Sequence, residues 1–259
     1  MSKLFTAAAI LCLAFSPAWA QKGPDPPTGS PQAPTTTGGP DAFGYVFFDQ
    51  AEPECPFQYI DIAGTGAAQN HADDQNTTVV LGGPAFDFYA TSYTQVAFDS
   101  NGYLQLGTPT AADFTNDCPV PNTTDPDNLI APYWDDFNPA EANADDDYFQ
   151  YFANCPRPSR FPGVPGCNVF QWRTCFFGSS CGGVQQDLEV ILYDTWDIVY
   201  QYQQTTQTGT SASIGIENSD ASIGLGYSCN TGGAVGPGSA VCFFHPNPVP
   251  VALEDFSAE

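Results

Sequence analysis

The sequence predicts an all-β protein, an antiparallel β-sandwich of jelly-roll character that is stapled by disulfides. From Phe43 onward, short apolar or alternating runs are separated by Gly, Pro, Asn and Asp, at the spacing typical of a sandwich or barrel. No window of a dozen residues carries the apolar stripe of a helix. The chain also has 9 cysteines and no C-x-x-C spacing, which favours disulfides over a zinc site.

The first 20 residues have the order of a secretory signal peptide. Lys3 precedes an apolar run that ends at Phe15, and the small-residue segment Ala18–Ala20 follows before an expected cleavage at Gln21. The apolar run is far shorter than the roughly 20 residues that a membrane span needs. We therefore expect a secreted protein, extracellular or at the cell surface, with no membrane span.

Three segments follow the signal peptide. Residues 21–40 are rich in Pro, Gly and Thr, which predicts a disordered tether because such a segment buries little apolar surface. Residues 41–245 are expected to form a single β-sandwich domain, since no second linker of this composition divides them. Residues 246–259 are Pro-punctuated and then acidic, and we expect a C-terminal tail there.

The cysteines are expected to form four disulfides. Cys12 leaves with the signal peptide, and the remaining even set lies in a chain addressed to an oxidising compartment. Pairs close in sequence cost the least closure entropy. This favours Cys155–Cys167, Cys175–Cys181 and Cys229–Cys242, and leaves Cys55 to pair with Cys118.

The predicted strands fill most of the domain. They are residues 44–48, 57–62, 77–81, 86–89, 95–98, 103–106, 128–133, 148–152, 169–176, 188–193, 197–202, 212–217 and 222–227. Two hairpin turns are expected. Ser100-Asn101-Gly102 supplies residues that tolerate positive φ, and Asp194-Thr195-Trp196 joins two strands rich in β-branched and aromatic residues. Most aromatic side chains fall within these strands and are expected in the core.

Several short motifs run through this region. They include GPDAFGY at residues 39–45, SNGYL at 100–104, NLIAPYWDD at 128–136 and IGIEN at 214–218. Together they resemble the accessory β-sandwich domain of secreted bacterial proteins and peptidases, and more distantly the nidogen-type extracellular domain. The resemblance implies a nidogen-like sandwich with a non-catalytic adhesion, recognition or structural role, and it brings no active-site residues. The eight cysteines of the domain depart from the bacterial pattern, in which disulfides are few.

Charge narrows the classes of partner. The chain has 29 acidic residues against 5 Lys and Arg, for a net charge of −24. A nucleic-acid partner requires clustered cations, and anionic membranes do too, so both are excluded. Once Lys3 is removed, the cations left are Lys22, Arg157, Arg160 and Arg173. Calcium or a basic partner has the compatible sign.

Calcium needs several carboxylate and carbonyl oxygens gathered on loops. Three acidic loops offer them, at residues 73–76, 125–128 and 145–147. We expect the Asp135-Asp136 pair, which follows a predicted strand, to join the second or third of these loops. The candidate metal ligands are Asp73 and Asp74, Asp125 and Asp127, Asp135 and Asp136, and Asp145 and Asp147. No EF-hand spacing is present, so a diffuse acidic face is the alternative.

No catalytic motif is recognisable. The chain has only His71 and His245, neither in a triad motif, and we expect both to be solvated surface residues. The enzymatic alternative is a glycosidase-like site that uses Glu189 and Glu217 as paired carboxylates.

We therefore expect a non-catalytic module that binds an extracellular protein or glycan, or that has a structural role at a surface. A self-assembling subunit of an extracellular fibre or matrix is the first alternative, with the tether or tail pairing to a neighbour's sheet edge. The glycosidase-like enzyme is the second.

Overall fold

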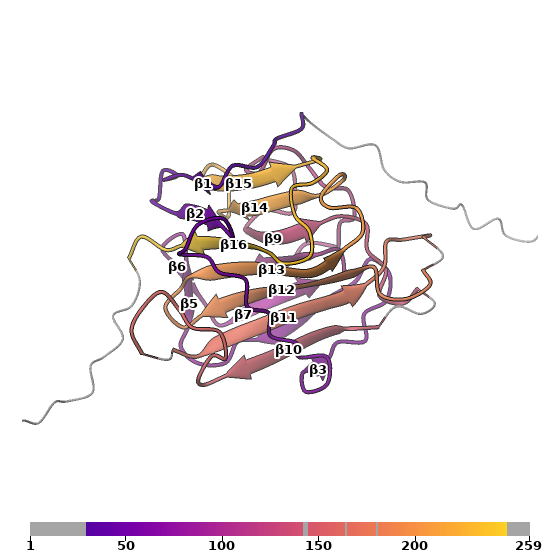
Figure 1. The fold of residues 1–259 in the computed structure, drawn as a ribbon, viewed down its shortest axis with the longest axis horizontal. Helices are drawn as coiled ribbons and strands as arrows, with labels where there is room; N and C mark the ends of the chain where they lie inside the picture. Colours follow the sequence, from indigo (N-terminus) through magenta and orange to yellow (C-terminus); the bar gives the residue numbers. More distant parts are fainter. Residues whose placement is uncertain (1–29, 142–144, 164, 180, 248–259) are drawn as a thin grey trace, which may run out of the picture.

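The computed structural model describes residues 30–141, 145–163, 165–179 and 181–247, and it confirms the predicted all-β, disulfide-stapled antiparallel sandwich. Two sheets are stacked face to face (Figure 1). The described residues contain no helix. The predicted signal peptide, residues 21–29 of the predicted tether, and the tail from residue 248 lie outside the described residues.

The larger sheet has eight strands in the order β1-β2-β16-β13-β12-β11-β10-β3. Their bounds are β1 Thr37–Gly38, β2 Val46–Asp49, β16 Ser239–Phe244, β13 Ile198–Thr205, β12 Gln186–Tyr193, β11 Cys167–Thr174, β10 Asp147–Phe152 and β3 Ala67–Ala68. All neighbouring strands pair antiparallel.

The smaller sheet has six strands in the order β15-β14-β9-β8-β7-β4. Their bounds are β15 Gly224–Cys229, β14 Ser213–Glu217, β9 Leu129–Trp134, β8 Tyr103–Leu106, β7 Gln95–Asp99 and β4 Asn76–Val80. A separate hairpin consists of β5 Phe86–Phe88 and β6 Thr91–Tyr93.

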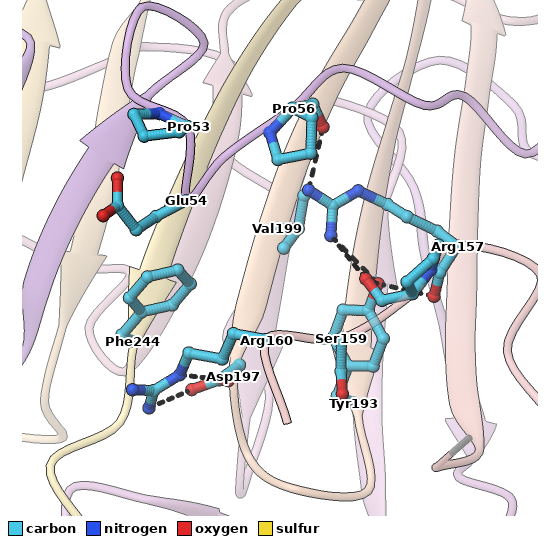
Figure 2. A pocket seen from close by; sticks show the side chains of 11 residues that line it. Pro53, Glu54, Pro56, Arg157, Ser159, Arg160, Tyr193, Asp197, Val199 and Phe244 are labelled. Atoms are coloured by element: carbon cyan, nitrogen blue, oxygen red, sulfur yellow. Dashed lines mark hydrogen bonds and ion pairs between the residues drawn. The ribbon is translucent and has the colours of Figure 1, made fainter. Parts of the chain in front are cut away.

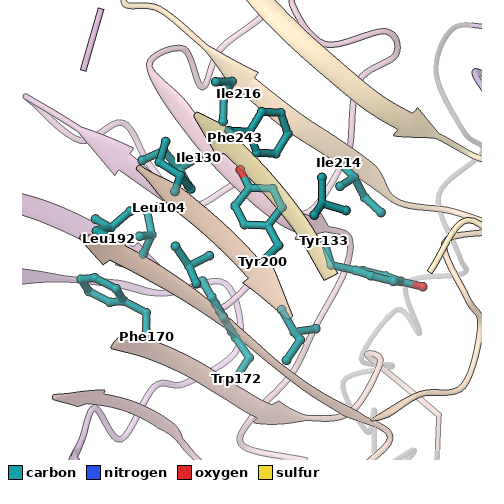
Figure 3. Close-up of a cluster of buried hydrophobic side chains, with 14 of the residues drawn as sticks. Leu104, Ile130, Tyr133, Phe170, Trp172, Leu192, Tyr200, Ile214, Ile216 and Phe243 are labelled. Atoms are coloured by element: carbon teal, nitrogen blue, oxygen red, sulfur yellow. The ribbon is translucent and has the colours of Figure 1, made fainter. Parts of the chain in front are cut away.

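The main core lies between the sheets. Most aromatic residues lie in or pack against this core and the two smaller apolar clusters, as predicted. Alternate side chains of facing strands meet in the main core, for example Leu192 and Tyr200 from the larger sheet and Ile130 and Ile214 from the smaller (Figure 3). The buried Tyr200 hydroxyl donates to the Gly215 carbonyl at 2.8 Å, which ties β13 to β14 across the sandwich. Aromatic bulk therefore fills the interior while its polar atom is satisfied by the opposite sheet.

One predicted strand is absent, and β16 was missed, as were the short strands β1, β3 and β6. Residues 57–62 form no strand and instead cross the outer face of the larger sheet. β16 was not predicted, although it lies inside the larger sheet between β2 and β13. Its side chains are apolar on both faces, with Val241 and Phe243 toward the sandwich core and Ala240 and Cys242 toward the outer face. It therefore lacks the alternation that marks a half-exposed strand.

Both predicted hairpin turns are confirmed. Residues 100–102 connect β7 to β8, and residues 194–196 connect the ends of β12 and β13. Gly102 has a φ of 78°, and a Cβ there would lie 2.0 Å from the Tyr133 carbonyl oxygen. The turn therefore requires glycine, because a side chain would collide with the β9 backbone.

All eight cysteines of the domain are oxidised, but half of the predicted pairing was wrong. Cys155–Cys167 and Cys175–Cys181 are confirmed. The other two disulfides are Cys55–Cys242 and Cys118–Cys229, rather than the local pair Cys229–Cys242. Cys229 ends β15 in the smaller sheet and Cys242 lies on β16 in the larger sheet, so the short chain segment between them changes sheets and carries the two sulfurs apart.

The end of the predicted tether, residues 30–40, takes part in the fold. Gln32 exchanges two backbone hydrogen bonds with Cys229, at 2.8 and 2.9 Å, on the free side of β15. A few residues later, β1 pairs with β2 at the edge of the larger sheet. One short segment thus lies against an edge of each sheet.

Candidate functional site

A row of polar side chains crosses the outer face of the larger sheet. Gln171, Glu189 and Gln201 are direct cross-strand neighbours on β11, β12 and β13, and all three are fully buried. Each accepts a hydrogen bond from a backbone N–H of the segment at residues 58–62: Gln171 from Ile62 at 2.8 Å, Glu189 from Ile60 at 3.0 Å, and Gln201 from Gln58. The row therefore binds this covering segment. The segment pairs with no strand, and the side chains of the row accept its backbone N–H groups instead.

The structure places Glu189 and Glu217, the two carboxylates of the glycosidase-like alternative, on different sheets. Glu189 lies under this segment on the larger sheet, and burial raises its pKa well above the usual value. Glu217 lies on β14 of the smaller sheet, where it accepts from the Asn122 N–H at 3.0 Å and burial raises its pKa to about 8. Their strand neighbours Val190 and Ile216 point into the sandwich core. Both carboxyls thus point outward from different sheets and do not face one another.

The expectation of solvated histidines was wrong. His71 is 4% exposed, and its Nδ1 lies 2.7 Å from Asp147 Oδ2 on β10. Its Nε2 lies 3.0 Å from Thr77 Oγ1 on β4, so the ring connects the two sheets. His245 is also buried, with its ring packed edge-on against Tyr45. Single polar residues outside a periodic run carry no burial signal in the sequence, which is why both were misplaced.

The structure brings three predicted metal ligands together. Oxygens of Asp73, Asp74 and Asp136 lie within 4.8 Å of one another at one end of the smaller sheet. β4 begins where β7 ends, and the Asp135 N–H donates to the carbonyl of Asn101 in the β7–β8 turn at 3.2 Å. The Asp135-Asp136 pair therefore lies beside the first acidic loop, not the second or third as predicted.

The other candidate ligands lie elsewhere. Asp135 accepts from the Ser211 hydroxyl at 2.6 Å, and Asp147 is the partner of His71. Asp145 forms an ion pair with Arg173 at 3.1 Å. Asp125 is exposed, and Asp127 lies two residues later in the same loop, which precedes β9. Only the cluster of Asp73, Asp74 and Asp136, among the described residues, gathers three candidate ligands.

A cleft of about 320 Å³ lies on the outer face of the larger sheet, over β12, β13 and β16 (Figure 2). Two short segments form its walls, residues 53–56 and residues 157–160. The Cys55–Cys242 disulfide fixes the first wall to β16, and Cys155–Cys167 fixes the second to β11. Tyr193, Val199 and Phe244 form its floor.

The cleft contains two of the three arginines of the described residues, which is unusual in so acidic a chain. Arg157 is 4% exposed, and its terminal nitrogens donate to the Tyr193 hydroxyl at 3.0 Å and to the Pro56 carbonyl at 2.9 Å. It joins the two walls and has a structural role. No carboxylate of the described residues forms an ion pair with it.

Arg160 is the accessible cation of the cleft. Its Nε and Nη2 donate to the Asp197 carboxylate at 2.8 and 2.9 Å, and Nη2 also donates to the His245 carbonyl. Its guanidinium lies 4.3 and 4.4 Å from the ring centres of Phe161 and Phe244. These contacts fix the side chain, which is 29% exposed, while Nη1 makes none of these hydrogen bonds. Nη1 of this fixed, partly exposed side chain has no hydrogen-bond partner among the described residues, and we take it as the group that meets a ligand.

The sequence named Arg157 and Arg160 as surviving cations but gave no reason to place them together with Glu54 and Phe244. These residues are far apart in the chain, and two disulfides and the strand order bring them to one face. The one local sign of this cleft in the sequence was that Arg157 and Arg160 lie close together in the chain, just after Cys155.

Comparisons with known proteins agree with the architecture. The family model described as "NIDO related" matches residues 44–235, which is most of the chain. No curated protein and no solved structure matches this chain. Among the described residues, no helix has the length and apolar character of a membrane span. A nidogen-related domain with four disulfides is consistent with an extracellular protein. The distant nidogen-type resemblance is thus confirmed, and the chain belongs to the NIDO-related family.

Proposed function

We propose that the chain is a secreted, non-catalytic module that binds an extracellular protein or glycan through the cleft at Arg160. One observation carries this proposal: the cleft presents a fixed guanidinium, whose Nη1 has no hydrogen-bond partner among the described residues, on a chain of net charge −24. The buried carboxylates Glu189 and Glu217, by contrast, hold covering segments in place.

The ligand chemistry follows from the lining of the cleft. A guanidinium recognises planar carboxylates, and the adjoining Phe244 and Pro56 offer apolar surface to the body of a ligand. Asp197 balances the charge of Arg160, while the exposed Glu54 on the opposite wall repels an anion. The net charge of −24 repels an acidic partner at long range, so the local contact with Arg160 must carry the binding. We therefore expect only modest affinity for a carboxylate-bearing partner such as an acidic polysaccharide or an acidic peptide.

Binding to polygalacturonate, with dextran as the neutral reference, tests this proposal. Arg160→Gln is expected to weaken polygalacturonate binding about tenfold, since a charge-assisted hydrogen bond is worth about 1.5 kcal/mol. Glu54→Gln is expected to strengthen it by removing the opposing charge. Arg173→Gln is the matched control, because Arg173 is also ion-paired and partly exposed but lies outside the cleft. Equal effects of Arg160→Gln and Arg173→Gln would show that only net charge matters and would reject the cleft.

The proposal also includes Ca²⁺ at the cluster of Asp73, Asp74 and Asp136. Three carboxylates this close repel one another, and a hard cation with oxygen ligands relieves that repulsion. The two loops that supply them are separated in sequence by the six strands β4 to β9, so a bound ion would join the start of β4 to the end of β9.

Calcium at about 100 times its dissociation constant is expected to stabilise the protein by about 2.7 kcal/mol, which the thermal midpoint with and without a chelator would measure. Asp136→Asn is expected to remove most of this shift, whereas Asp125→Asn, in another acidic loop, is expected to retain it. An equal shift in both variants, or no shift in the unaltered protein, would contradict a site at this cluster.

Self-association is the second candidate function. The observation that favours it is the open edge of β4, where Val80 is 69% exposed.

A further inference from the structure

Each sheet of the sandwich has two edges, and three of the four edges are blunted. β1 and β3, at the edges of the larger sheet, have two residues each. β15, at one edge of the smaller sheet, is covered where Gln32 makes two backbone hydrogen bonds to Cys229 and donates from its side chain to the Gly226 carbonyl at 3.0 Å. Short or covered edges resist pairing with another chain.

β4 is the exception. It has five residues, pairs only with β7, and has no other described strand beside it. Backbone hydrogen bonds join Gln75 to Ser100 at 2.8 Å and Leu81 to Thr94 at 2.9 Å, at the two ends of the β4–β7 ladder, which has no register shift. The odd-numbered residues therefore bond to β7. The backbone N–H and C=O groups of Thr78 and Val80 consequently point away from the sheet.

The side chains of β4 suit a close neighbour. The strand reads Asn-Thr-Thr-Val-Val and has no charged residue, in a chain with 29 acidic residues. Thr78 is exposed, and Val80 is the one large hydrophobic residue of the described chain that is strongly exposed. Edges that must stay unpaired usually carry charge or proline, and β4 carries neither.

We propose that β4 pairs antiparallel with β4 of a second copy of this chain, about a two-fold axis at Thr78, to form a continuous sheet across two molecules. This self-pairing rests on the second candidate function, self-association, and does not depend on the cleft at Arg160. In this register Thr78 faces its own copy and Val80 faces Asn76, so every outward backbone group of the strand acquires a partner.

This register brings no acidic side chains of the two paired strands close together. The nearest acidic residue before the strand, Asp74, would lie opposite residue 82 of the partner. The two copies of Asp74 would then be eight residues apart along the paired strands, or about 27 Å at the rise of an antiparallel strand. That separation exceeds the screening length of about 8 Å at physiological salt. A two-fold contact through one strand buries little area, so we expect a weak dimer with a dissociation constant on the order of 10 µM.

Sedimentation velocity of the secreted chain over a concentration series tests the proposal. The unaltered protein is expected to shift from monomer to dimer as concentration rises through about 10 µM. Thr78→Pro removes an N–H that only the partner would use, and Val80→Glu places a charge at the contact. Both are expected to stay monomeric with circular dichroism like that of the unaltered protein. Thr91→Glu, on the exposed strand β6, is expected to dimerise normally. A monomeric unaltered protein, or dimers in all three variants, would overturn the proposal.

A cross-linking variant tests the register. Directly opposed residues in a hydrogen-bonded antiparallel pair have Cα atoms about 5.5 Å apart, within the range that a disulfide bridges. The described cysteines are all oxidised, so Thr78→Cys would supply a single thiol at the two-fold axis. We expect it to form a covalent dimer under mild oxidation and Thr91→Cys to form none. Equal cross-linking of the two variants would reject this register. Loss of dimerisation is expected to leave polygalacturonate binding unchanged, so failure of this proposal is distinguishable from failure of the cleft.

Discussion

Raising the pH from 5 to 8 is expected to lower the thermal midpoint of unfolding by about 5–10 °C, which corresponds to a loss of a few kcal/mol for a domain of this size. Burial raises the pKa of Asp147 to about 6, of Asp99 to about 7 and of Glu217 to about 8. Each value lies above that of the unfolded chain, so the folded protein binds these protons more tightly. Stability is therefore greatest near the unfolded pKa values, about pH 4, and is lost as the pH rises toward 8.

Glu217→Gln is the control for this pH dependence. The amide keeps an oxygen that can accept from the Asn122 N–H, but it has no charge to bury. We expect its thermal midpoint to fall less between pH 5 and 8 than that of the unaltered protein, with the difference concentrated at pH 8. Scanning calorimetry at several pH values measures both slopes. A midpoint that rises with pH would show that the folded state does not raise the pKa of these carboxyls.

Replacing both Cys55 and Cys242 by alanine is expected to destabilise the fold by about 4–5 kcal/mol, since this disulfide closes a long loop in the unfolded chain. The two residues are separated by 187 positions, and both are fully buried. The same disulfide anchors residues 53–56 to β16, so its loss is also expected to open the cleft at Arg160. Polygalacturonate binding should then weaken under conditions in which the variant remains folded.

The matched comparison is the double alanine variant of Cys175 and Cys181, which are separated by only 6 positions. The same chain-entropy reasoning predicts a loss of about 2 kcal/mol for that variant. Urea unfolding of the two variants beside the unaltered protein measures the difference. Equal losses would indicate that native packing around the sulfurs, rather than the length of the closed loop, sets their contribution.

The fold class could be predicted from the sequence because its signals are local. Short apolar or alternating runs bounded by turn residues identify a strand within a few positions, as in Gln95–Asp99 and Tyr103–Leu106, both of which are largely buried. The turn at Gly102 is equally local, because it depends on the conformational freedom of one residue. The two short-range disulfides belong to the same class of prediction, since closure entropy favours neighbours.

The parts that were missed depend on which strand enters which sheet. β15 and β16 are consecutive in the chain but belong to different sheets, which separates Cys229 from Cys242. Cys229 therefore pairs with Cys118, and Cys242 pairs with Cys55. Residues 57–62 have the composition of a strand, yet their backbone N–H groups are satisfied by side chains of the larger sheet. Composition does not distinguish a segment whose backbone N–H groups bond to a neighbouring strand from one whose N–H groups bond to side chains.

The sequence by itself determined the all-β class, the oxidised cysteines and the acidic character, because each follows from residue types and short spacings. Only the tertiary structure decided that Asp136 lies beside Asp73 and Asp74, that Glu189 and Glu217 face away from each other, and that Arg157 and Arg160 share a cleft. These outcomes depend on strand order and on contacts between residues far apart in the chain, which local periodicity does not encode.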